Sequence, residues 1–489
     1  MKANVKRPAR FSFKTITEKK AKHLTLIFVA VLFLVIVVLA LFPLLDREEE
    51  RYEVTTYAMG SYVQQTVYGE NREDAAVKAA DAVEALEQKI SWRVANSDIQ
   101  KLNNNAGKDW VTLSDETLNV LTQAQSVSEK SGGAFDVTIA PISRLWDFDD
   151  ELNEVPDSDL ITSLLPYVNY SLLRIDETEQ TASLKNLGMA VDLGSVGKGA
   201  ACDAAVRAYE EAGAKAAIIA VGGSVGVYGE KSSGKPWSVA VRDPNGDGSL
   251  GSVTLAEGFV STSGSYEKYF EQDGVLYHHL LDPKTGYPAE SGLVSVTVVA
   301  KSGVLSDALS TACFVLGRED GMKLLEEFDA EGIFINSDNN ITVTDGLKAA
   351  LHAQAAITRL FPERGAAMEK RKFSWKEALL LVLVLAVAAG VYLYAKTRPK
   401  GAEAVIEQDG EVYRRVVLAD LKEPLTLEVN GAVIELDKDG AHFVSSPCPD
   451  KICVNKGIIK RAGESAVCLP QRVGVRIEGG DSEIDSVTG

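Results

Sequence analysis

Apolar residues recur at helical spacing in several stretches of the 489-residue chain. Within residues 72–90 they stand at Ala76, Val83, Leu86 and Ile90, so they share one face of an amphipathic helix. Further helices are predicted over 115–131 with Ser114 as N-cap, over 200–212, from Ser306 onward, and over 322–328.

Shorter runs that alternate in polarity, or are uniformly apolar, predict β-strands. The strongest is 293–300, with the sequence LVSVTVVA. Gly132 and Gly133 predict the end of the second helix, with a strand after them. The remaining strands are predicted at 62–68, 215–221, 225–228, 237–242, 266–270, 275–281, 332–336 and 340–344. We assign these helices and strands to one domain over residues 52–365.

Two longer runs lack charged residues and fit the length of a membrane span, which takes roughly 20 apolar residues. They cover 24–45 and 378–395, and we predict a transmembrane helix in each. Residues 1–23 are rich in lysine and arginine, so the positive-inside rule predicts a cytoplasmic N-terminus. The expected location is the plasma membrane, with the domain at 52–365 outside the cytoplasm. A cleaved signal peptide is disfavoured because the first run is too long and no small-residue cleavage pattern follows it.

The side of the membrane on which the C-terminal part lies stays open. Simple alternation puts it inside, yet the heavier basic cluster, at 370–376, would then lie outside. The sequence from Met368 onward resembles the start of a separate membrane-anchored protein, which suggests a gene fusion. Six short strands predict a small all-β domain over 402–480, at 404–408, 411–418, 425–429, 432–437, 440–445 and 472–477.

Composition and charge narrow the function classes. The net charge of −18 argues against a nucleic-acid-binding surface. Five cysteines are too few for a disulfide scaffold. The chain holds five histidines, and two of these, His278 and His279, are adjacent and close to Asp282. This group is either part of a decorated hairpin or a general base with a carboxylate partner.

Two further patterns combine glycines or hydroxyls with charged residues. The turn Asp192–Gly199, DLGSVGKG, comes between a strand and a helix, where backbone amides can approach a phosphate. It has neither Walker nor G-x-G-x-x-G spacing, so a phosphate cradle and a plain tight turn both remain open. Asp307 and Thr311 lie four residues apart near a helix start and so share a face. They suit a hard cation that also holds diphosphate oxygens, or a capped helix with a buried threonine.

The segment Val260–Pro288 carries the motif that identifies the domain. It contains the block STSGSY at 261–266 and, from His279, the pattern H-x-x-D-P-x-T-G-x-P. Together they resemble the ApbE family, the FAD:protein FMN transferases, and the resemblance extends over residues 52–365. The implied fold class is an α+β catalytic domain between the two transmembrane helices, followed by the small all-β domain.

The resemblance also implies roles for individual residues. His279 would be the catalytic base, oriented by Asp282, and backbone amides near Gly197 would hold the diphosphate. The implied metal ligands are Ser195, Asp307 and Thr311. The residues implied to bind the flavin nucleotide are Met59, Trp92, Ala134, Phe135, Asp136, Asp192, Lys198 and Leu281, with the ring of Phe135 suited to stacking on a flavin or adenine ring.

The implied reaction uses Mg²⁺ and takes FAD as its substrate. FMN is transferred to a threonine or serine hydroxyl of a partner flavoprotein, and AMP is released. The acceptor would carry D-x-x-S-G-[AST]-[TS], as an RnfG- or NqrC-like subunit or another extracellular flavoprotein at the membrane. The segment DSVTG at 485–489 lacks the Ser-Gly pair, so a separate acceptor protein is expected. Two alternatives stay open: a Mg²⁺-dependent FAD pyrophosphatase giving FMN and AMP, and a membrane-anchored flavin-binding protein without catalysis.

A second resemblance concerns the C-terminal domain. The run 446–470, with Cys448, Cys453 and Cys468, resembles NusG domain II-like modules. No chemistry follows from this resemblance, and we expect a scaffold or docking role beside the flavinylated partner. The three cysteines leave three alternatives open: a zinc site, a disulfide if the domain lies outside the cytoplasm, or buried thiols.

Overall fold

The computed structural model describes residues 51–148, 154–231, 234, 236–244, 248–348, 351–353, 403–408, 411–448, 451–460, 464–468, 470–478 and 486–488. Its α+β and all-β parts agree with the predicted fold class, but the transmembrane part of that prediction is wrong for the described residues. None of their helices is both long and apolar enough to cross a membrane. The longest, α2 (Arg72–Ile90), has 19 residues and is charged along its exposed side. The runs 24–45 and 378–395, which suggested the spans, lie outside the described residues.

An eight-stranded antiparallel sheet forms the centre of the α+β domain. Its strands, in spatial order, are β1 (Arg51–Ala58), β2 (Ser61–Tyr68), β6 (Ala216–Val221), β7 (Ser224–Tyr228), β10 (Gly258–Gly264), β13 (Leu293–Ala300), β14 (Glu331–Asn336) and β15 (Ile341–Val343). β13 has the predicted bounds, and it is buried on both faces because layers cover the sheet on each side.

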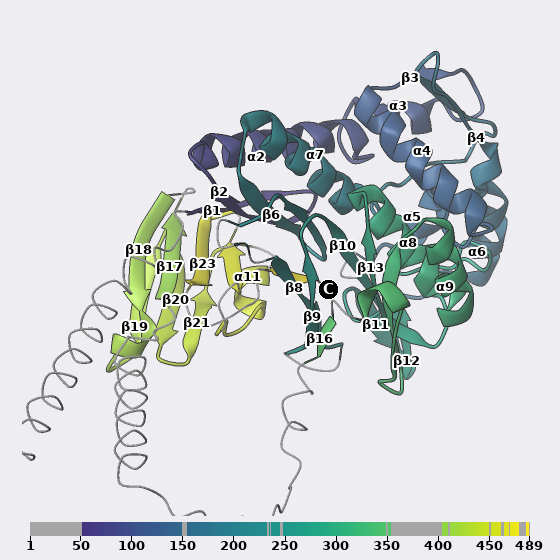
Figure 1. The fold of residues 1–489 in the computed structure, drawn as a ribbon. Coiled ribbons are helices and arrows are strands. Elements are labelled where there is room, and N and C mark those ends of the chain that lie inside the picture. Colours follow the sequence, from purple (N-terminus) through teal and green to yellow (C-terminus); the bar gives the residue numbers. More distant parts are fainter. Residues whose placement is uncertain are drawn as a thin grey trace, which may run out of the picture. The chain divides into compact units, whose positions relative to one another are not determined.

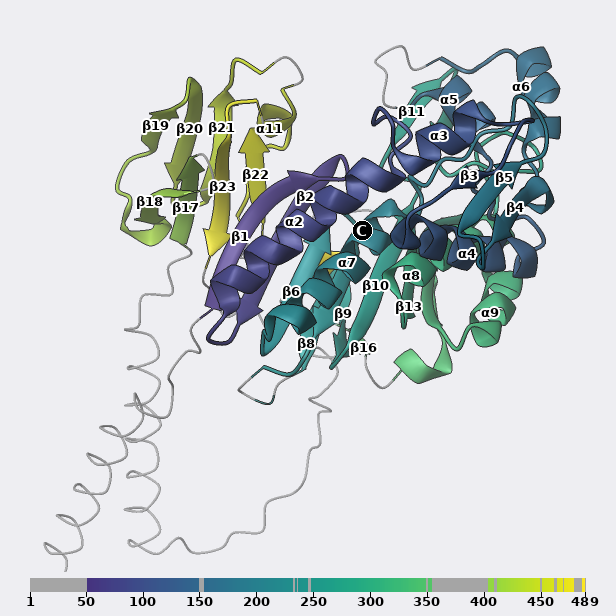
Figure 2. The ribbon, with the colours of Figure 1, turned by 90° about the horizontal axis from the view of Figure 1, so that it is seen from above.

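Helices cover one face of this sheet and a second sheet covers the other (Figures 1 and 2). On the first face α2 packs along α7 (Gly197–Ala212), and buried alanines such as Ala76 and Ala205 allow the close approach. On the opposite face Trp237 and Val239 pack against Ile218 and other residues of the large sheet. The second sheet contains β16 (Leu351–Ala353), β9 (Ser249–Leu255), β8 (Trp237–Arg242) and β24 (Ser486–Thr488), in that order.

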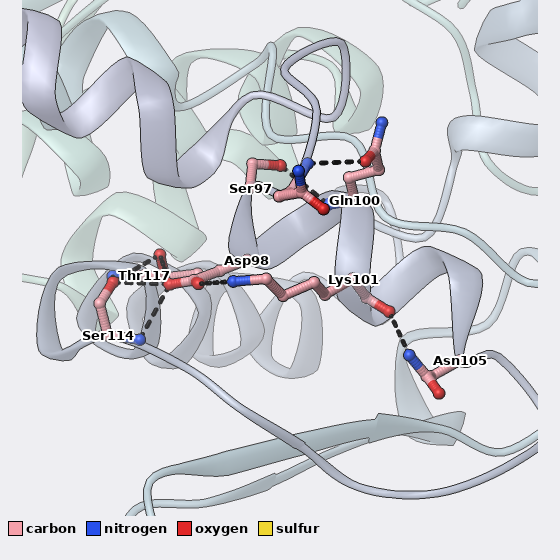
Figure 3. A network of polar contacts seen from close by, with 8 residues as sticks. Ser97, Asp98, Gln100, Lys101, Asn105, Ser114 and Thr117 are labelled. Atoms are coloured by element: carbon pink, nitrogen blue, oxygen red, sulfur yellow. Dashed lines mark hydrogen bonds and ion pairs between the residues drawn. The ribbon is translucent and has the colours of Figure 1, made fainter.

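A helical region follows α2. It contains α3 (Asp98–Asn104), α4 (Asp115–Lys130), α5 (Ala140–Trp146), α6 (Ser158–Leu164) and a small sheet of β3 (Val111–Thr112), β5 (Thr181–Leu184) and β4 (Leu173–Asp176). Asp98 joins α3 to α4, since its Oδ2 accepts hydrogen bonds from Ser114 N at 2.9 Å and Thr117 Oγ1 at 3.0 Å (Figure 3). Burial opposes the charge, but these bonds outweigh it and lower the pKa of Asp98. Ser114 is the N-cap of α4, as predicted.

Two helices and a hairpin complete the α+β domain. These are α8 (Gly303–Leu316), α9 (Arg318–Glu327), and the hairpin of β11 (Tyr269–Gln272) and β12 (Val275–His278). The helix predicted to start at Ser306 begins at Gly303, because the Ser302 side chain accepts the Leu305 amide and acts as the N-cap.

The described part of the C-terminal domain is all-β apart from the short helix α11 (Ile452–Asn455) and one 3-10 turn at Leu418–Asp420. One sheet contains β18 (Glu411–Val417), β17 (Glu403–Gln408), β23 (Val473–Glu478) and β22 (Ser465–Cys468), and the other β19 (Leu425–Val429), β20 (Ala432–Asp437) and β21 (Gly440–Ser445). Its buried residues form a core of their own. Two hydrogen bonds join it to β2: Tyr62 Oη donates to Val467 O at 2.7 Å, and Gln64 Nε2 donates to Ser465 Oγ at 2.6 Å.

Candidate active site

A cleft of about 2150 Å³ lies beside the β6–β7 turn and the end of β10. It brings together every predicted site residue except Asp282, although Pro283, the next residue, does line it. The predicted residues that line the cleft are Met59, Trp92, Ala134, Phe135, Asp136, Asp192, Ser195, Lys198, His279, Leu281, Asp307 and Thr311. Side chains scattered along the α+β domain therefore share one space, and their individual roles remain predictions.

Asp307 is fixed in one corner of this cleft. Its Oδ2 accepts a hydrogen bond from Gly199 N at 2.6 Å, and its Oδ1 accepts one from Ser224 Oγ at 2.6 Å. One turn further along α8, Thr311 Oγ1 lies 3.2 Å from Ser263 Oγ on β10. Each carboxylate oxygen keeps a lone pair that could bind a metal. The potential metal ligands in this corner are therefore oxygen atoms, which Mg²⁺ prefers. The residues present fit a hard cation.

Two helix starts hold each other in place beside this corner. Asp203 on α7 accepts hydrogen bonds from the amides of Gly303 at 2.8 Å and Val304 at 3.0 Å, so it caps α8. In return Asp307 on α8 accepts the amide of Gly199 in the first turn of α7. Carboxylates are favoured at helix N-termini, where backbone amides have no partner within the helix. Asp203 was not predicted from the sequence, because nothing local links it to a helix that begins 100 residues later.

The turn Asp192–Gly199 is only partly available as a phosphate cradle. The amides of Gly194, Gly197 and Gly199 already donate to Asp192 Oδ1, Leu193 O and Asp307 Oδ2. The prediction that amides near Gly197 hold the diphosphate must therefore be narrowed to those of Ser195 and Lys198, which have no acceptor among the described residues. Ser195 is exposed and lines the cleft together with the Lys198 side chain.

The two adjacent histidines have different environments. His279 lines the cleft, and its Nδ1 lies 3.2 Å from Lys268 O, which fits a proton on Nδ1 and leaves Nε2 unprotonated. Enclosure lowers the pKa of His279 to about 4, helped by the positive charges of Lys198 and Lys268, so the ring is neutral at neutral pH. His278 is 8% exposed and packs edge-on against Phe314, as a core residue does.

Asp282 shapes the turn that follows His279. Its Oδ1 accepts the amide of Lys284 at 2.9 Å, and its own amide donates to Tyr287 O at 2.8 Å. Among the described residues the partner of the His279 ring is Lys268 O, and no hydrogen bond joins His279 to Asp282. A catalytic role for Asp282 stays a prediction, whereas its contacts are those of a turn former.

Trp92 presents an aromatic wall that sequence analysis described only in part. The guanidinium of Arg144 lies 4.1 Å from the Trp92 ring centre and that of Arg93 lies 4.6 Å from it. All three residues line the cleft. A ring with cations stacked on it suits an electron-rich heterocycle with phosphates attached. Arg93 is adjacent to Trp92 in the sequence, but Arg144 comes from α5, so only the fold reveals it.

The stretch Ala134–Asp136 forms the wall of the cleft. Phe135 is 2% exposed and packs in the main core, which argues against the predicted stacking of its ring on a ligand. Asp136 accepts hydrogen bonds from Thr138 Oγ1 at 2.6 Å and Tyr170 N at 2.8 Å. Burial raises the pKa of Asp136 against the effect of these bonds. Because they hold residues 136–138 in turns, the strand predicted after Gly133 does not form.

Met59 reaches the cleft from the hairpin turn between β1 and β2. The two-residue turn Met59-Gly60 has φ angles of 55° and 65°. Such turns favour asparagine, aspartate or glycine at the first position, and a methionine there is strained. The role of Met59 in binding the flavin nucleotide stays a prediction.

The three cysteines of the C-terminal domain form a buried cluster. Their sulfur atoms all lie within 4.8 Å of one another, and those of Cys448 and Cys453 are 3.7 Å apart. No disulfide joins them in the part of the chain that the structure describes. This geometry is compatible with each of the three alternatives: a metal site, a disulfide or buried thiols.

Comparisons with known proteins agree with the division of the chain into an α+β domain and a C-terminal β domain. The ApbE family profile matches residues 59–334, and the NusG domain II profile matches residues 378–481. The FAD:protein FMN transferase of Treponema pallidum (strain Nichols) is 33% identical over 322 residues, which cover 62% of this chain and 88% of that protein. The enzyme of the same name from Klebsiella pneumoniae (strain 342) is 31% identical over 296 residues, covering 60% and 92%.

Solved structures agree with these sequence matches. The crystal structure of the ApbE protein from Thermotoga maritima has 31% sequence identity and a TM-score of 0.58, and the match covers 62% of this chain and 100% of that one. The flavin transferase ApbE from Vibrio cholerae has 25% identity and a TM-score of 0.56, with the same coverage. The α+β domain is therefore similar to both over their whole length.

Proposed function

The chain belongs to the ApbE family, and we infer that it is an FAD:protein FMN transferase, which moves the FMN half of FAD onto an acceptor flavoprotein and releases AMP. The observation that carries this inference is the cleft itself. It places a neutral histidine, the Lys198 side chain and an oxygen-rich corner around one space. These are the groups that a phosphoryl transfer to a hydroxyl requires.

FAD has an anionic diphosphate between two aromatic ring systems, and the cleft offers partners for both parts. Trp92, with Arg144 and Arg93 on its ring, would receive one of the ring systems. Lys198 and the amides of Ser195 and Lys198 would bind diphosphate oxygens at the start of α7. Met59 would contact the nucleotide from the opposite hairpin.

Mg²⁺ would be held by the Asp307 carboxylate and the Thr311 hydroxyl, with Ser195 as a further oxygen donor. The bound cation would screen the diphosphate charge and stabilise the leaving phosphate of AMP. Gly199 and Ser224 keep the Asp307 carboxylate pointed at the cleft through their hydrogen bonds, so this chain supplies a preformed ligand. Because the cleft places one carboxylate there, most remaining ligands would be phosphate oxygens and water.

The chemical step would form one bond to phosphorus and break another. The acceptor oxygen attacks the FMN phosphorus, its proton passes to Nε2 of His279, and the bond to the AMP phosphate breaks. Lys268 O keeps the other ring proton on Nδ1, so the ring faces the acceptor with its basic nitrogen. The low pKa of His279 keeps that nitrogen unprotonated before the acceptor arrives.

Incubation of the purified chain with FAD, Mg²⁺ and candidate acceptor proteins tests this function. The expected result is a fluorescent flavin band on a denaturing gel at the mass of the acceptor, with AMP released in equal amount. FMN that appears free in solution with AMP would instead show a pyrophosphatase. FAD that stays intact with every acceptor would show a binding protein.

A further inference from the structure

β24 is an extended strand of the chain's own tail that occupies the edge of β8. Its residues Ser486, Val487 and Thr488 stand opposite Val239, Ala240 and Val241, and the two strands run parallel. Every other pairing between named strands in the described residues is antiparallel. β24 also contacts β6, β7 and β10, so its place along β8 lies between the two sheets of the α+β domain, and we call this place the channel.

Thr488 anchors the strand in this channel. It is fully buried, its Oγ1 donates to Gly223 O at 2.6 Å, and the same oxygen lies 3.0 Å from Thr262 Oγ1. Thr262 Oγ1 in turn lies 2.8 Å from Thr297 Oγ1. The channel therefore contains a binding position for one hydroxyl group. The Gly223 carbonyl accepts its hydrogen bond, and the Thr262 hydroxyl is its second partner.

The channel runs into the cleft of the active site. Gly223, Thr262, Ala240 and Arg242 all line the cleft. Because β24 runs parallel to β8, a polypeptide on this path continues past the Thr488 position in the direction of Arg242. Since Arg242 lines the cleft, a bound strand that extends beyond this position would enter the cleft.

Thr488 itself does not lie at the reacting position. Thr262 and Ser263 are neighbours on β10, so their side chains point to opposite faces of the sheet. Thr262 meets Thr488, whereas Ser263 meets Thr311 in the oxygen-rich corner. The Thr488 position therefore sets the register of a bound strand, and the hydroxyl that reacts comes from a later residue of that strand.

We propose that an acceptor polypeptide enters the cleft as an extended strand that pairs with the edge of β8. The chain's own strand β24 occupies the same edge, so the acceptor competes with it. The acceptor places a serine or threonine at the position of Thr488 and pairs its backbone with β8. The proposal rests on the proposed transferase function, because that function requires a polypeptide hydroxyl in the cleft.

Peptide binding to the full chain tests the channel without any turnover. The probe is a fluorescein-labelled synthetic peptide with the sequence of residues 481–489, and its matched control replaces the threonine with valine. We expect the Thr488→Val chain to bind the threonine peptide about tenfold more tightly than the wild-type chain, since its own strand has lost two hydrogen-bonding partners. The valine peptide should bind at least tenfold more weakly, and Thr488→Ser should behave as wild type.

Flavin transfer then links the channel to the reaction. Thr488→Val should raise the flavin attached to a limiting acceptor protein, and added threonine peptide should suppress it. Equal peptide affinity for wild type and Thr488→Val, or equal affinity of the two peptides, would overturn the channel. If the peptide binds but does not suppress flavin transfer, the channel exists but is not the path by which the acceptor enters. A wild-type chain that attaches FMN to no acceptor would refute the proposed function, and the acceptor role of the channel with it.

Discussion

Gly199 and Gly303 meet backbone to backbone where α7 crosses α8. A Cβ atom on Gly199 would lie 1.9 Å from Gly303 O, and one on Gly303 would lie 2.1 Å from Gly199 O. Only glycine at both positions allows this approach. The same crossing lets Asp307 reach the Gly199 amide, so the helix contact and the metal corner depend on one another.

Gly199→Ala should therefore lower the free energy of unfolding by at least about 1–3 kcal/mol, the usual range for overpacking a tight interface. Urea unfolding followed by circular dichroism measures it. Gly197→Ala is the matched control, because the nearest atom to its added Cβ is Ile90 Cδ1 at 3.7 Å. Equal stabilities of the two variants would contradict the crossing as described.

Asp307→Asn should reduce FMN transfer by roughly 10²–10³-fold and raise the Mg²⁺ concentration that gives half-maximal rate, since it removes the charge from the cation corner. A Mg²⁺ titration of AMP release measures both effects. Asp203→Asn serves as the control, because Asp203 caps α8 without lining the cleft. That variant should lose stability and keep the wild-type Mg²⁺ dependence. Transfer that resists both EDTA and Asp307→Asn would eliminate the metal site.

His279→Gln should lower the rate of FMN transfer by about 10²–10⁴-fold, the usual contribution of a general base, and leave FAD binding intact. Stopped-flow rates and flavin fluorescence titration separate the two quantities. Wild-type transfer should stay constant from neutral pH down to about pH 5 and fall as the pH approaches the His279 pKa of about 4. A variant that transfers FMN at the wild-type rate would exclude His279 as the base.

The same pKa makes a prediction about stability. The pKa of His279 is lowered from 6.5 in the unfolded chain to about 4 in the folded chain, so the unfolded chain binds more protons between these values. Folding stability contributed by the neutral ring is therefore fully present above pH 6.5 and is lost as the pH falls towards 4. Wild type should lose more stability than His279→Gln over this window in parallel urea titrations. Parallel curves for the two chains would contradict the enclosed site.

Trp92→Ala should weaken FAD binding by about tenfold, because it removes the ring that Arg93 and Arg144 cover. Trp110→Ala is the control, since Trp110 is 48% exposed and does not line the cleft. Quenching of flavin fluorescence on binding gives both dissociation constants. If the two tryptophan variants bind FAD equally, the proposed aromatic wall is wrong.

Local patterns in the sequence predicted the strongly periodic elements, whereas short ones such as α3, α5 and β9 were not predicted. The helix Arg72–Ile90 and the strand Leu293–Ala300 have the predicted bounds. Both depend on a periodicity that neighbouring residues carry by themselves. Resemblance to a family supplied site residues that all line the cleft except Asp282.

Features that depend on distant partners were not predictable in the same way. The stretch after Gly133 has strand-like residues, but Asp136 binds Tyr170 N and holds it in turns. The His279 ring forms its hydrogen bond with the backbone carbonyl of Lys268, just before β11, although Asp282 is nearer in the sequence. The strand β24 has no local sequence signal, because it is extended only through its pairing with the edge of β8.

The C-terminal domain supplies part of the cleft wall through Lys456, Ile459, Lys460 and Ser465. A covalent link between two folded units keeps both at one-to-one stoichiometry. The shape of the cleft thus depends on residues held by two separately packed cores. Both groups of residues come from a single polypeptide.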